Sequence, residues 1–500
     1  MKRFFFLPFF FLATLMMCSK TTKEPVKLTL NIVAEPSTLD TRKIRILADT
    51  NVANMIYEGL FRSTNSGPIL ALAESYTVDE SETIYRFKIR KSSWSNGAAI
   101  TANDFVKTYQ STLSPDFPSD YANLLYYIKG AEEIKLGKQS IETLGVKAID
   151  PTTIEFELEH PIPYFLDLLC LPIYYPLPEG NSVYSGPFIL SKWQHSYQIT
   201  LMKNPFYWDK EAVKLDRVDL LMCESETGLQ MFEKGQLDLE GDPFSKIPPD
   251  NFEHLANTGA LLQQPVMATH WIRVNTSRDD LKNKFFRQAI ATSIHRKDLS
   301  EHVLYNFKVP TLRICPFSTA PCAYEDGSRE TAKELIFAHP QSRPYVLSYK
   351  STPINHRMAQ AIQSQLERVG IEITLERLEP KVFFSRLSKI DFDLALGAWV
   401  ADVPDSINFL QNFRTSDTGT NSTHWENLRY KELLDAAIQL KGADRATALK
   451  EAEAILLEES PVIPLLQETM LYVKNPRLKG VHISNLGLLN IKGAYFSDED

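Results

Sequence analysis

The strongest constraint on this chain is the apolar run at its N-terminus. Lys2 and Arg3 precede residues 4–17, which are almost entirely apolar. Two positive charges before a short apolar core are typical of a secretory signal peptide. The run is also shorter than the roughly 20 residues that a membrane span needs. We therefore expect residues 1–17 to be a signal peptide and the rest of the chain to fold outside the cytoplasm.

Cys18 stands where the apolar run ends. The sequence Leu15-Met16-Met17-Cys18 resembles a bacterial lipoprotein box, in which the signal is cut before a cysteine that is then lipidated. Met17 departs from the small residue that is usual there. We expect Cys18 to be lipidated, with residues 18–27 as a tether to a membrane surface. Plain secretion and an uncleaved anchor are the alternatives.

Size and charge narrow the class of protein. About 480 residues follow the signal peptide, more than one hydrophobic core usually serves, so two or three subdomains are expected. The net charge is −8 and basic residues do not cluster, which argues against a nucleic-acid partner. No later segment is apolar enough to span a bilayer.

The remaining cysteines are few for a chain of this length. Cys170, Cys223, Cys315 and Cys322 do not form the dense pattern of a disulfide scaffold. Cys315 and Cys322 flank a short loop, and they could form a disulfide that clamps it or remain two free thiols, since sequence does not supply the required geometry. We expect no metal site, because neither a CxxC pair nor a nearby histidine pair is present.

Hydrophobic periodicity predicts helices and strands along the whole chain. Thr101, with Asp104 three residues later, predicts a capped helix start. Another helix is expected over 51–60, ended by Gly59. Helices and strands alternate in the second half, which predicts an α/β lobe with a mixed sheet, while the first half is richer in strands. The expected strands are 27–33, 83–89, 153–158, 371–375 and 392–396, and the later helices are 283–295, 356–369, 430–440 and 445–457.

The common catalytic and nucleotide-binding motifs are missing from this sequence. It contains no GxGxxG loop, no GxxxxGK[ST] loop, no HExxH zinc motif and no GxSxG elbow. This pattern favours a binding protein over an enzyme, and no cofactor is expected. An extracytoplasmic enzyme such as a peptidase stays open as an alternative, because scattered acidic and histidine residues do not exclude one.

A series of short phrases, in a fixed order, carries a family resemblance over nearly the whole mature chain. The chain resembles the periplasmic oligopeptide-binding proteins of ABC importers, extracellular solute-binding protein family 5. Each phrase alone is weak, but the ordered set is specific. The phrases are YEGL at 57–60, WSNG at 94–97, ITANDF at 100–105, LGVKA at 144–148, PIPYF at 161–165, SGPF at 185–188, KNPFYW at 203–208, GQLD at 235–238 and RQAI at 287–290.

The resemblance implies an α/β fold, namely a two-lobed periplasmic binding protein of the class II, cluster C type. It also implies an extra strand-rich subdomain and a ligand cleft between the lobes. It further implies a monomer that captures short peptides and delivers them to an ABC permease with separate ATPase subunits. The expected divisions are lobe I at 28–57, 176–275 and 473–500, the subdomain at 58–175, and lobe II at 276–472.

The resemblance also implies ligand-binding residues. Asp402, after the phrase Gly397-Ala398-Trp399-Val400-Ala401, matches an aspartate that holds the ligand's α-ammonium group. Without the resemblance, the preferred interpretation of Asp402 is a loop aspartate that caps a helix around 406–413. The strand before it would pair with an extended peptide, and Trp399 would line the pocket. Further expected ligand-binding residues are Ala398, Val400, Tyr121, Asn421 and Leu47, the last where the other lobe would offer its own strand.

Departures from the family pattern leave the ligand class open. A carboxylate-binding arginine of the family aligns with Leu396, and an acidic position near the pocket aligns with Arg45. Arg45 or Arg386 could therefore recognise the ligand carboxylate. Alternatively, the ligand is specialised: a dipeptide, a murein tripeptide, haem or a nickel chelate. A sensor or adhesin that kept the fold is a further possibility.

Overall fold

The computed structural model describes residues 25–119, 121–178, 180, 182–316, 318–322, 324–416 and 421–498. The expected signal peptide, Cys18 and most of the tether lie outside these residues. Within the described ranges, no helix is both long and apolar enough to cross a membrane.

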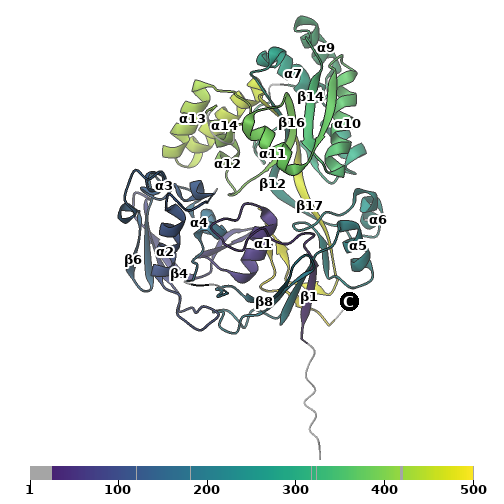
Figure 1. The fold of residues 1–500 in the computed structure, drawn as a ribbon. Helices are drawn as coiled ribbons and strands as arrows, with labels where there is room; N and C mark the ends of the chain where they lie inside the picture. Colours follow the sequence, from purple (N-terminus) through teal and green to yellow (C-terminus); the bar gives the residue numbers. More distant parts are fainter. Residues whose placement is uncertain are drawn as a thin grey trace, which may run out of the picture.

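One mixed sheet of eleven strands runs through both lobes. At its centre lie two antiparallel 13-residue strands, β12 (Leu262–Val274) and β17 (Val462–Lys474), which pass between the lobes (Figure 1). Their register shifts twice, between Pro265 and Thr269 and between His270 and Trp271. The chain therefore crosses between the lobes through paired strands rather than through flexible linkers.

Lobe I continues the sheet from β17, and its strands are mostly buried. Beside it lie α1 (Leu47–Ile56), α5 (Ser225–Glu233) and α6 (Phe252–Asn257) (Figure 1). The predicted helix end at Gly59 is wrong, because α1 stops at Ile56. Gly59 is needed for space instead: a Cβ there would lie 2.4 Å from the Tyr175 ring. The strands of this side are, in spatial order, β11 (Leu239–Gly241), β1 (Lys27–Asn31), β10 (Arg217–Leu221), β9 (Gln198–Lys203) and β8 (Phe188–Gln194).

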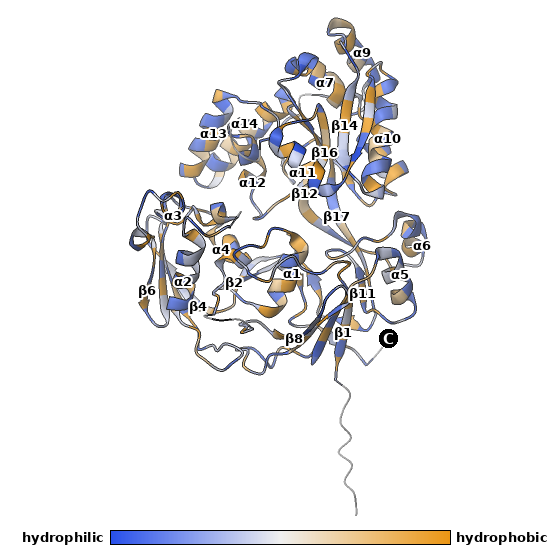
Figure 2. Ribbon diagram, in the orientation of Figure 1, coloured by the Kyte–Doolittle hydropathy of each residue, from blue (hydrophilic) through white to orange (hydrophobic). Residues whose placement is uncertain are grey.

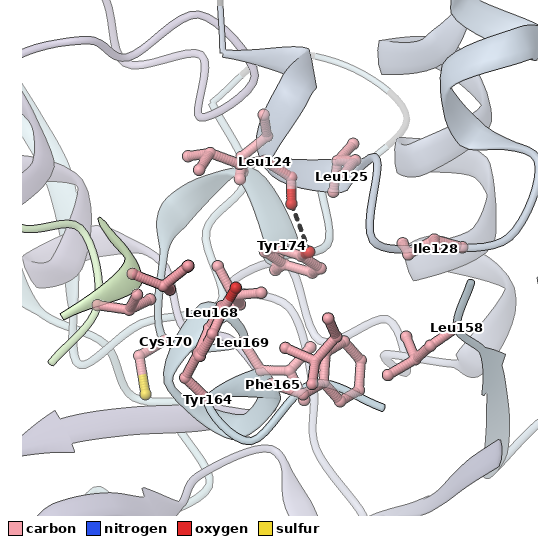
Figure 3. Packing of buried hydrophobic residues seen from close by; sticks show 14 of the residues in the cluster. Leu124, Leu125, Ile128, Leu158, Tyr164, Phe165, Leu168, Leu169, Cys170 and Tyr174 are labelled. Atoms are coloured by element: carbon pink, nitrogen blue, oxygen red, sulfur yellow. Dashed lines mark hydrogen bonds between the residues drawn. The ribbon is translucent and has the colours of Figure 1, made fainter. Parts of the chain in front are cut away.

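A strand-rich subdomain packs beside lobe I and has its own antiparallel sheet. The capping box predicted at Thr101 is present at the start of a helix that covers this sheet. Figure 3 shows the subdomain core, where Phe165 lies among other apolar side chains and the Tyr174 hydroxyl donates to the Leu124 carbonyl at 2.6 Å. The elements are β4 (Ala73–Val78), β5 (Ile84–Ile89), β7 (Thr153–Glu157) and β6 (Val146–Asp150) in spatial order, with α2 (Ala102–Leu113), α3 (Ala131–Lys135) and α4 (Phe165–Leu168).

Lobe II carries three parallel strands flanked by helices, as the alternating pattern predicts. Figure 2 shows that its helices carry both hydrophilic and hydrophobic stretches, as elements with one face on a core do. The predicted helices and strands of this half are confirmed to within a few residues. They are β14 (Tyr345–Lys350), β15 (Ile373–Leu378), β16 (Leu394–Val400), α7 (Lys284–Ser293), α9 (Arg329–Ala338), α10 (Pro353–Glu367), α11 (Pro380–Lys389), α12 (Ile407–Leu410), α13 (Leu428–Gln439) and α14 (Gly442–Glu459).

The two lobes are in contact on the side of the subdomain. One buried apolar cluster includes Phe165 and Leu168 of the subdomain together with Ile407 and Phe413 of lobe II. An ion pair of 2.9 Å joins Lys441, just before α14, to Glu82 in the β4–β5 turn. The structure therefore has the lobes closed along this edge. The residue boundaries expected for the lobes stay predictions.

The disulfide considered for Cys315 and Cys322 is not formed. Both residues are free thiols. The Cys315 sulfur is buried 3.7 Å from the Ser406 carbonyl oxygen, and the Cys322 sulfur lies 3.3 Å from that of Tyr324. The two side chains are thus directed to different parts of lobe II, and the alternative of two thiols is the one observed.

Candidate ligand-binding site

Strand β16 offers an open backbone edge near the contact between the lobes. One edge of β16 pairs with β12 along its whole length, from Leu394 to Val400. On the other edge, β14 pairs only with residues 394–396. In the described part of the chain no strand continues this pairing along residues 397–400. Those residues therefore have backbone groups that an extended ligand could pair with.

Asp402 lies two residues beyond this edge and is positioned by Asn408 of α12. The Asn408 side-chain oxygen accepts from the Trp399 indole nitrogen at 3.0 Å and from the Asp402 backbone nitrogen at 3.1 Å. Its amide nitrogen lies 3.5 Å from Asp402 Oδ2. One buried amide thus fixes both the ring and the carboxylate that the sequence predicts to bind ligand.

No cationic side chain among the described residues pairs with the Asp402 carboxylate. Burial raises its pKa above the ordinary value, and the hydrogen bond from Asn408 offsets this only in part. A cationic group arriving at this position would find a desolvated carboxylate without a cation, which is the setting in which a charge-assisted hydrogen bond is strong.

The loop that carries Asp402 is also held by an ion pair. Asp405 receives two hydrogen bonds of 2.9 Å from Arg445 of α14. Both side chains are largely buried. Such a two-pronged pair fixes orientation as well as position, so the backbone between β16 and α12 is rigidly placed.

The residues expected on the opposite lobe are only partly as predicted. Arg45 and Tyr121 lie close together, with the Arg45 guanidinium 6.0 Å from the centre of the Tyr121 ring. Leu47, Tyr121 and Trp399 all pack against one large apolar cluster, which extends from the subdomain into lobe II. The expectation of a strand at Leu47 is wrong, because Leu47 is the first residue of α1 and the extended backbone ends at Ile46.

Two predicted side chains are already engaged within lobe II. Asn421 is buried. Its side-chain nitrogen donates hydrogen bonds to the carbonyls of Thr415 and Trp425, and its side-chain oxygen accepts one from the backbone nitrogen of Thr423. Arg386 donates to both carboxylate oxygens of Glu376, at 2.8 and 2.7 Å.

Ala398 and Val400 lie on the open edge itself, and Val400 is 42% exposed. Sequence reasoning missed Asn408, whose only signal is its place on the helix after Asp402. Among the residues described, no group of three or more histidine, cysteine or acidic side chains is arranged to hold a metal ion.

Comparison with known proteins assigns the family. The model described as "Bacterial extracellular solute-binding proteins, family 5 Middle" matches residues 67–421. The oligopeptide-binding protein OppA of Bacillus subtilis (strain 168) is 32% identical over 511 residues, covering 95% of this chain and 94% of that protein. The dipeptide-binding protein DppE of the same organism is 28% identical, covering 95% and 93%. The periplasmic murein peptide-binding protein MppA of Escherichia coli (strain K12) is 26% identical, covering 92% and 91%.

Solved structures agree with the two-lobed architecture. The periplasmic oligopeptide-binding protein OppAIV of Borrelia burgdorferi superimposes with a TM-score of 0.85 at 27% identity, covering 94% of this chain and all of that one. A Listeria monocytogenes OppA bound to peptide gives 0.81 at 25% identity, covering 95% and 100%. The chain therefore belongs to the bacterial extracellular solute-binding proteins of family 5.

Proposed function

We propose that this protein binds short peptides between its lobes, with the peptide's α-ammonium group at Asp402. The observation that carries the proposal is the open edge at residues 397–400, which ends beside an unpaired, desolvated carboxylate. Main-chain pairing along this edge does not depend on the ligand's side chains. A free amine at Asp402 would fix which end of the peptide lies there.

The proposal extends to transport. A monomer, exported and tethered through a lipidated Cys18, would release its peptide to an ABC permease driven by ATPase subunits. Closure of lobe II on lobe I and the subdomain, with the boundaries expected from the sequence, would bury the ligand. We propose no catalytic step, and a bound peptide should be recovered intact by mass spectrometry.

The direct test is calorimetric titration with tetra-alanine and with its N-acetylated form. We expect the acetylated peptide to bind roughly 10- to 100-fold more weakly, because a hydrogen bond between charged groups contributes about 1.5–3 kcal/mol. Asp402→Asn should lower the affinity for the free amine to a similar degree and remove the preference for it. Asp391→Asn is the matched control, because that carboxylate lies on the same lobe and is largely exposed.

Equal affinity of the wild type for both peptides would refute the role of Asp402. If the wild type binds no member of a mixed library of two- to six-residue peptides, peptide binding itself is refuted.

A specialised ligand is the second candidate. Leu396, in place of the family's carboxylate-binding arginine, and Arg45, in place of an acidic residue, favour it. Relatives named as dipeptide- and murein-peptide-binding proteins are consistent with such ligands. A thermal-shift panel of dipeptides, a murein tripeptide, haem and a nickel chelate would support this candidate only if one of them stabilises the protein more than tetra-alanine does.

A further inference from the structure

A cluster of buried charged side chains lies where β12 and β17 pass between the lobes. Its centre is Glu468 of β17, which falls within the first shift in register between these strands. Glu468 contacts the imidazole of His270 on β12 and accepts a hydrogen bond from Lys308, just before β13 (Val309–Pro310). All three side chains are largely buried. The strands that join the lobes are therefore held together, at an irregular point of their pairing, by buried charges.

Both lobes contribute charges to this cluster. On lobe I, Lys246 donates to one oxygen of Asp242, whose other oxygen accepts from the backbone nitrogen of Leu471 on β17 at 3.0 Å. Although burial raises the pKa of Glu468, the charges of Lys308, from lobe II, and Lys246 hold it well below its ordinary value. A bend between the lobes would therefore move these charges relative to one another.

Positive charges outnumber negative ones around His270. The Lys308 ammonium nitrogen lies 3.4 Å from His270 Nε2, and the charge of Lys350 on β14 also acts on the imidazole. With Lys246, three lysines face the two carboxylates of the cluster while the imidazole is neutral. A charged imidazole would bring the excess to two positive charges in a place shielded from water, where repulsion between like charges is strong.

Burial and the hydrogen bonding of its ring keep His270 neutral. Burial is the largest cause that lowers its pKa below the ordinary value, and the charge of Glu468 offsets this only in part. Nε2 faces the Glu468 carboxylate, so the neutral ring carries its proton on that nitrogen. Nδ1 is buried and, among the described residues, has no hydrogen-bond partner. A second proton, on Nδ1, would be a buried donor without an acceptor, which costs free energy.

We propose that His270 is a proton-sensitive switch between the closed and the open arrangement of the lobes. The closed arrangement needs the neutral ring. When the two strands bend at the register shift, Nδ1 reaches water and can take up a proton, and the charged ring then opposes closure because of the lysines around it. The inference rests on the lobe closure of the proposed function and adds a control of that closure by pH.

Acid should therefore open the protein and release its ligand. In water the ring titrates near its ordinary pKa of 6.5, whereas in the closed form its pKa is lower. Because the closed form has the lower pKa, closure is fully favoured above about pH 6.5 and is progressively lost as the pH falls below it. One proton taken up on opening weakens ligand binding by up to about tenfold for each pH unit in that range.

The test is calorimetric titration with tetra-alanine at pH 7.5 and at pH 5.5. We expect His270 to weaken binding by the wild type roughly five- to tenfold at the lower pH, in addition to any loss from protonation of Asp402. His270→Gln keeps a donor for Glu468 but takes up no proton, so the ratio of its two dissociation constants should be smaller by that factor. Lys308→Gln should also reduce the ratio, because without this cation the closed form is protonated more readily. His254→Gln, at an exposed histidine of α6, is the matched control and should keep the wild-type ratio.

Equal ratios in the wild type and His270→Gln would overturn the proposal. If His270→Gln does not fold, Lys308→Gln decides, and a ratio equal to that of the wild type overturns it. If no peptide binds at either pH, the proposed function is refuted, and small-angle X-ray scattering of the unliganded protein decides about the switch. A larger radius of gyration at pH 5.5 than at pH 7.5 in the wild type, but not in His270→Gln, supports the switch, and the absence of that difference overturns it.

Discussion

Glu240 of β11 gives a prediction about stability whose sign depends on pH. Its carboxylate is fully buried in lobe I, where one oxygen accepts from Asn31 at 3.3 Å and from Ser245 at 2.6 Å. The other oxygen has no hydrogen-bond partner. Burial raises the pKa of Glu240 to about 7, from an ordinary value of 4.5. We predict that Glu240→Gln stabilises the protein at pH 8 and has little effect at pH 4.5.

The magnitude follows from the two pKa values. At about 1.4 kcal/mol for each pH unit between them, the ionised carboxylate makes the folded state less stable by about 3 kcal/mol. Because the folded pKa is the higher one, stability is fully present below about pH 4.5. It declines as the pH rises towards 7 and then stays constant. Glutamine does not titrate, so the variant escapes this loss. For a chain of this size the gain corresponds to roughly 3 °C in melting temperature.

The assay is thermal unfolding of the wild type and Glu240→Gln at half-unit intervals from pH 4.5 to 8.5. Glu468→Gln is the contrasting control. The charge of Lys308 and the hydrogen bond from His270 hold the pKa of Glu468 well below its ordinary value, so its loss should destabilise the protein across this whole range. A Glu240→Gln effect that does not change with pH, or a destabilisation at pH 8, would show that burial does not raise the pKa of Glu240 in the folded protein.

Two further predictions concern the subdomain core and the ligand site. Phe165→Ala should lower the free energy of unfolding by about 3–5 kcal/mol, because the ring is fully buried against several other aromatic rings. Urea unfolding measures this, and a loss below 1 kcal/mol would mean that the core collapses into the cavity. Asn408→Ala should weaken tetra-alanine binding roughly tenfold, because Trp399 and Asp402 lose a shared hydrogen-bond partner. Unchanged affinity in calorimetry would contradict that positioning role.

Local signals in the sequence predicted local structure well. The capping box at Thr101 needs only residues three apart, and the helix near Asn283 follows from apolar spacing and a capping side chain. The predicted end of α1 was wrong, because the need for a glycine at position 59 comes from the ring of Tyr175, more than a hundred residues away. Predictions therefore held where the determining contacts were close in sequence.

The predictions for the candidate site divide in the same way, into those that depend on nearby residues and those that depend on distant ones. The phrase ending at Asp402 pointed to β16, where the structure has an open strand edge, because family resemblance carries positional information that composition does not. Sequence alone could not show that the Asn421 side chain hydrogen-bonds within its own loop or that Arg386 is paired with Glu376. Nor could it find Asn408, whose significance depends on which polar groups lie near it. These are questions of tertiary packing and desolvation.

The paired strands β12 and β17 have a mechanical consequence. Because both lobes belong to one hydrogen-bonded sheet, separation of the lobes must bend this two-stranded ribbon and cannot proceed by free rotation about a linker. The bend is easiest near Pro265–Trp271, where the irregular register already leaves ladder bonds unmade. The elastic properties of that short segment would then govern how wide the molecule opens and how fast it releases any cargo. The residues of the binding edge would determine which ligand binds, and they would not change the opening motion.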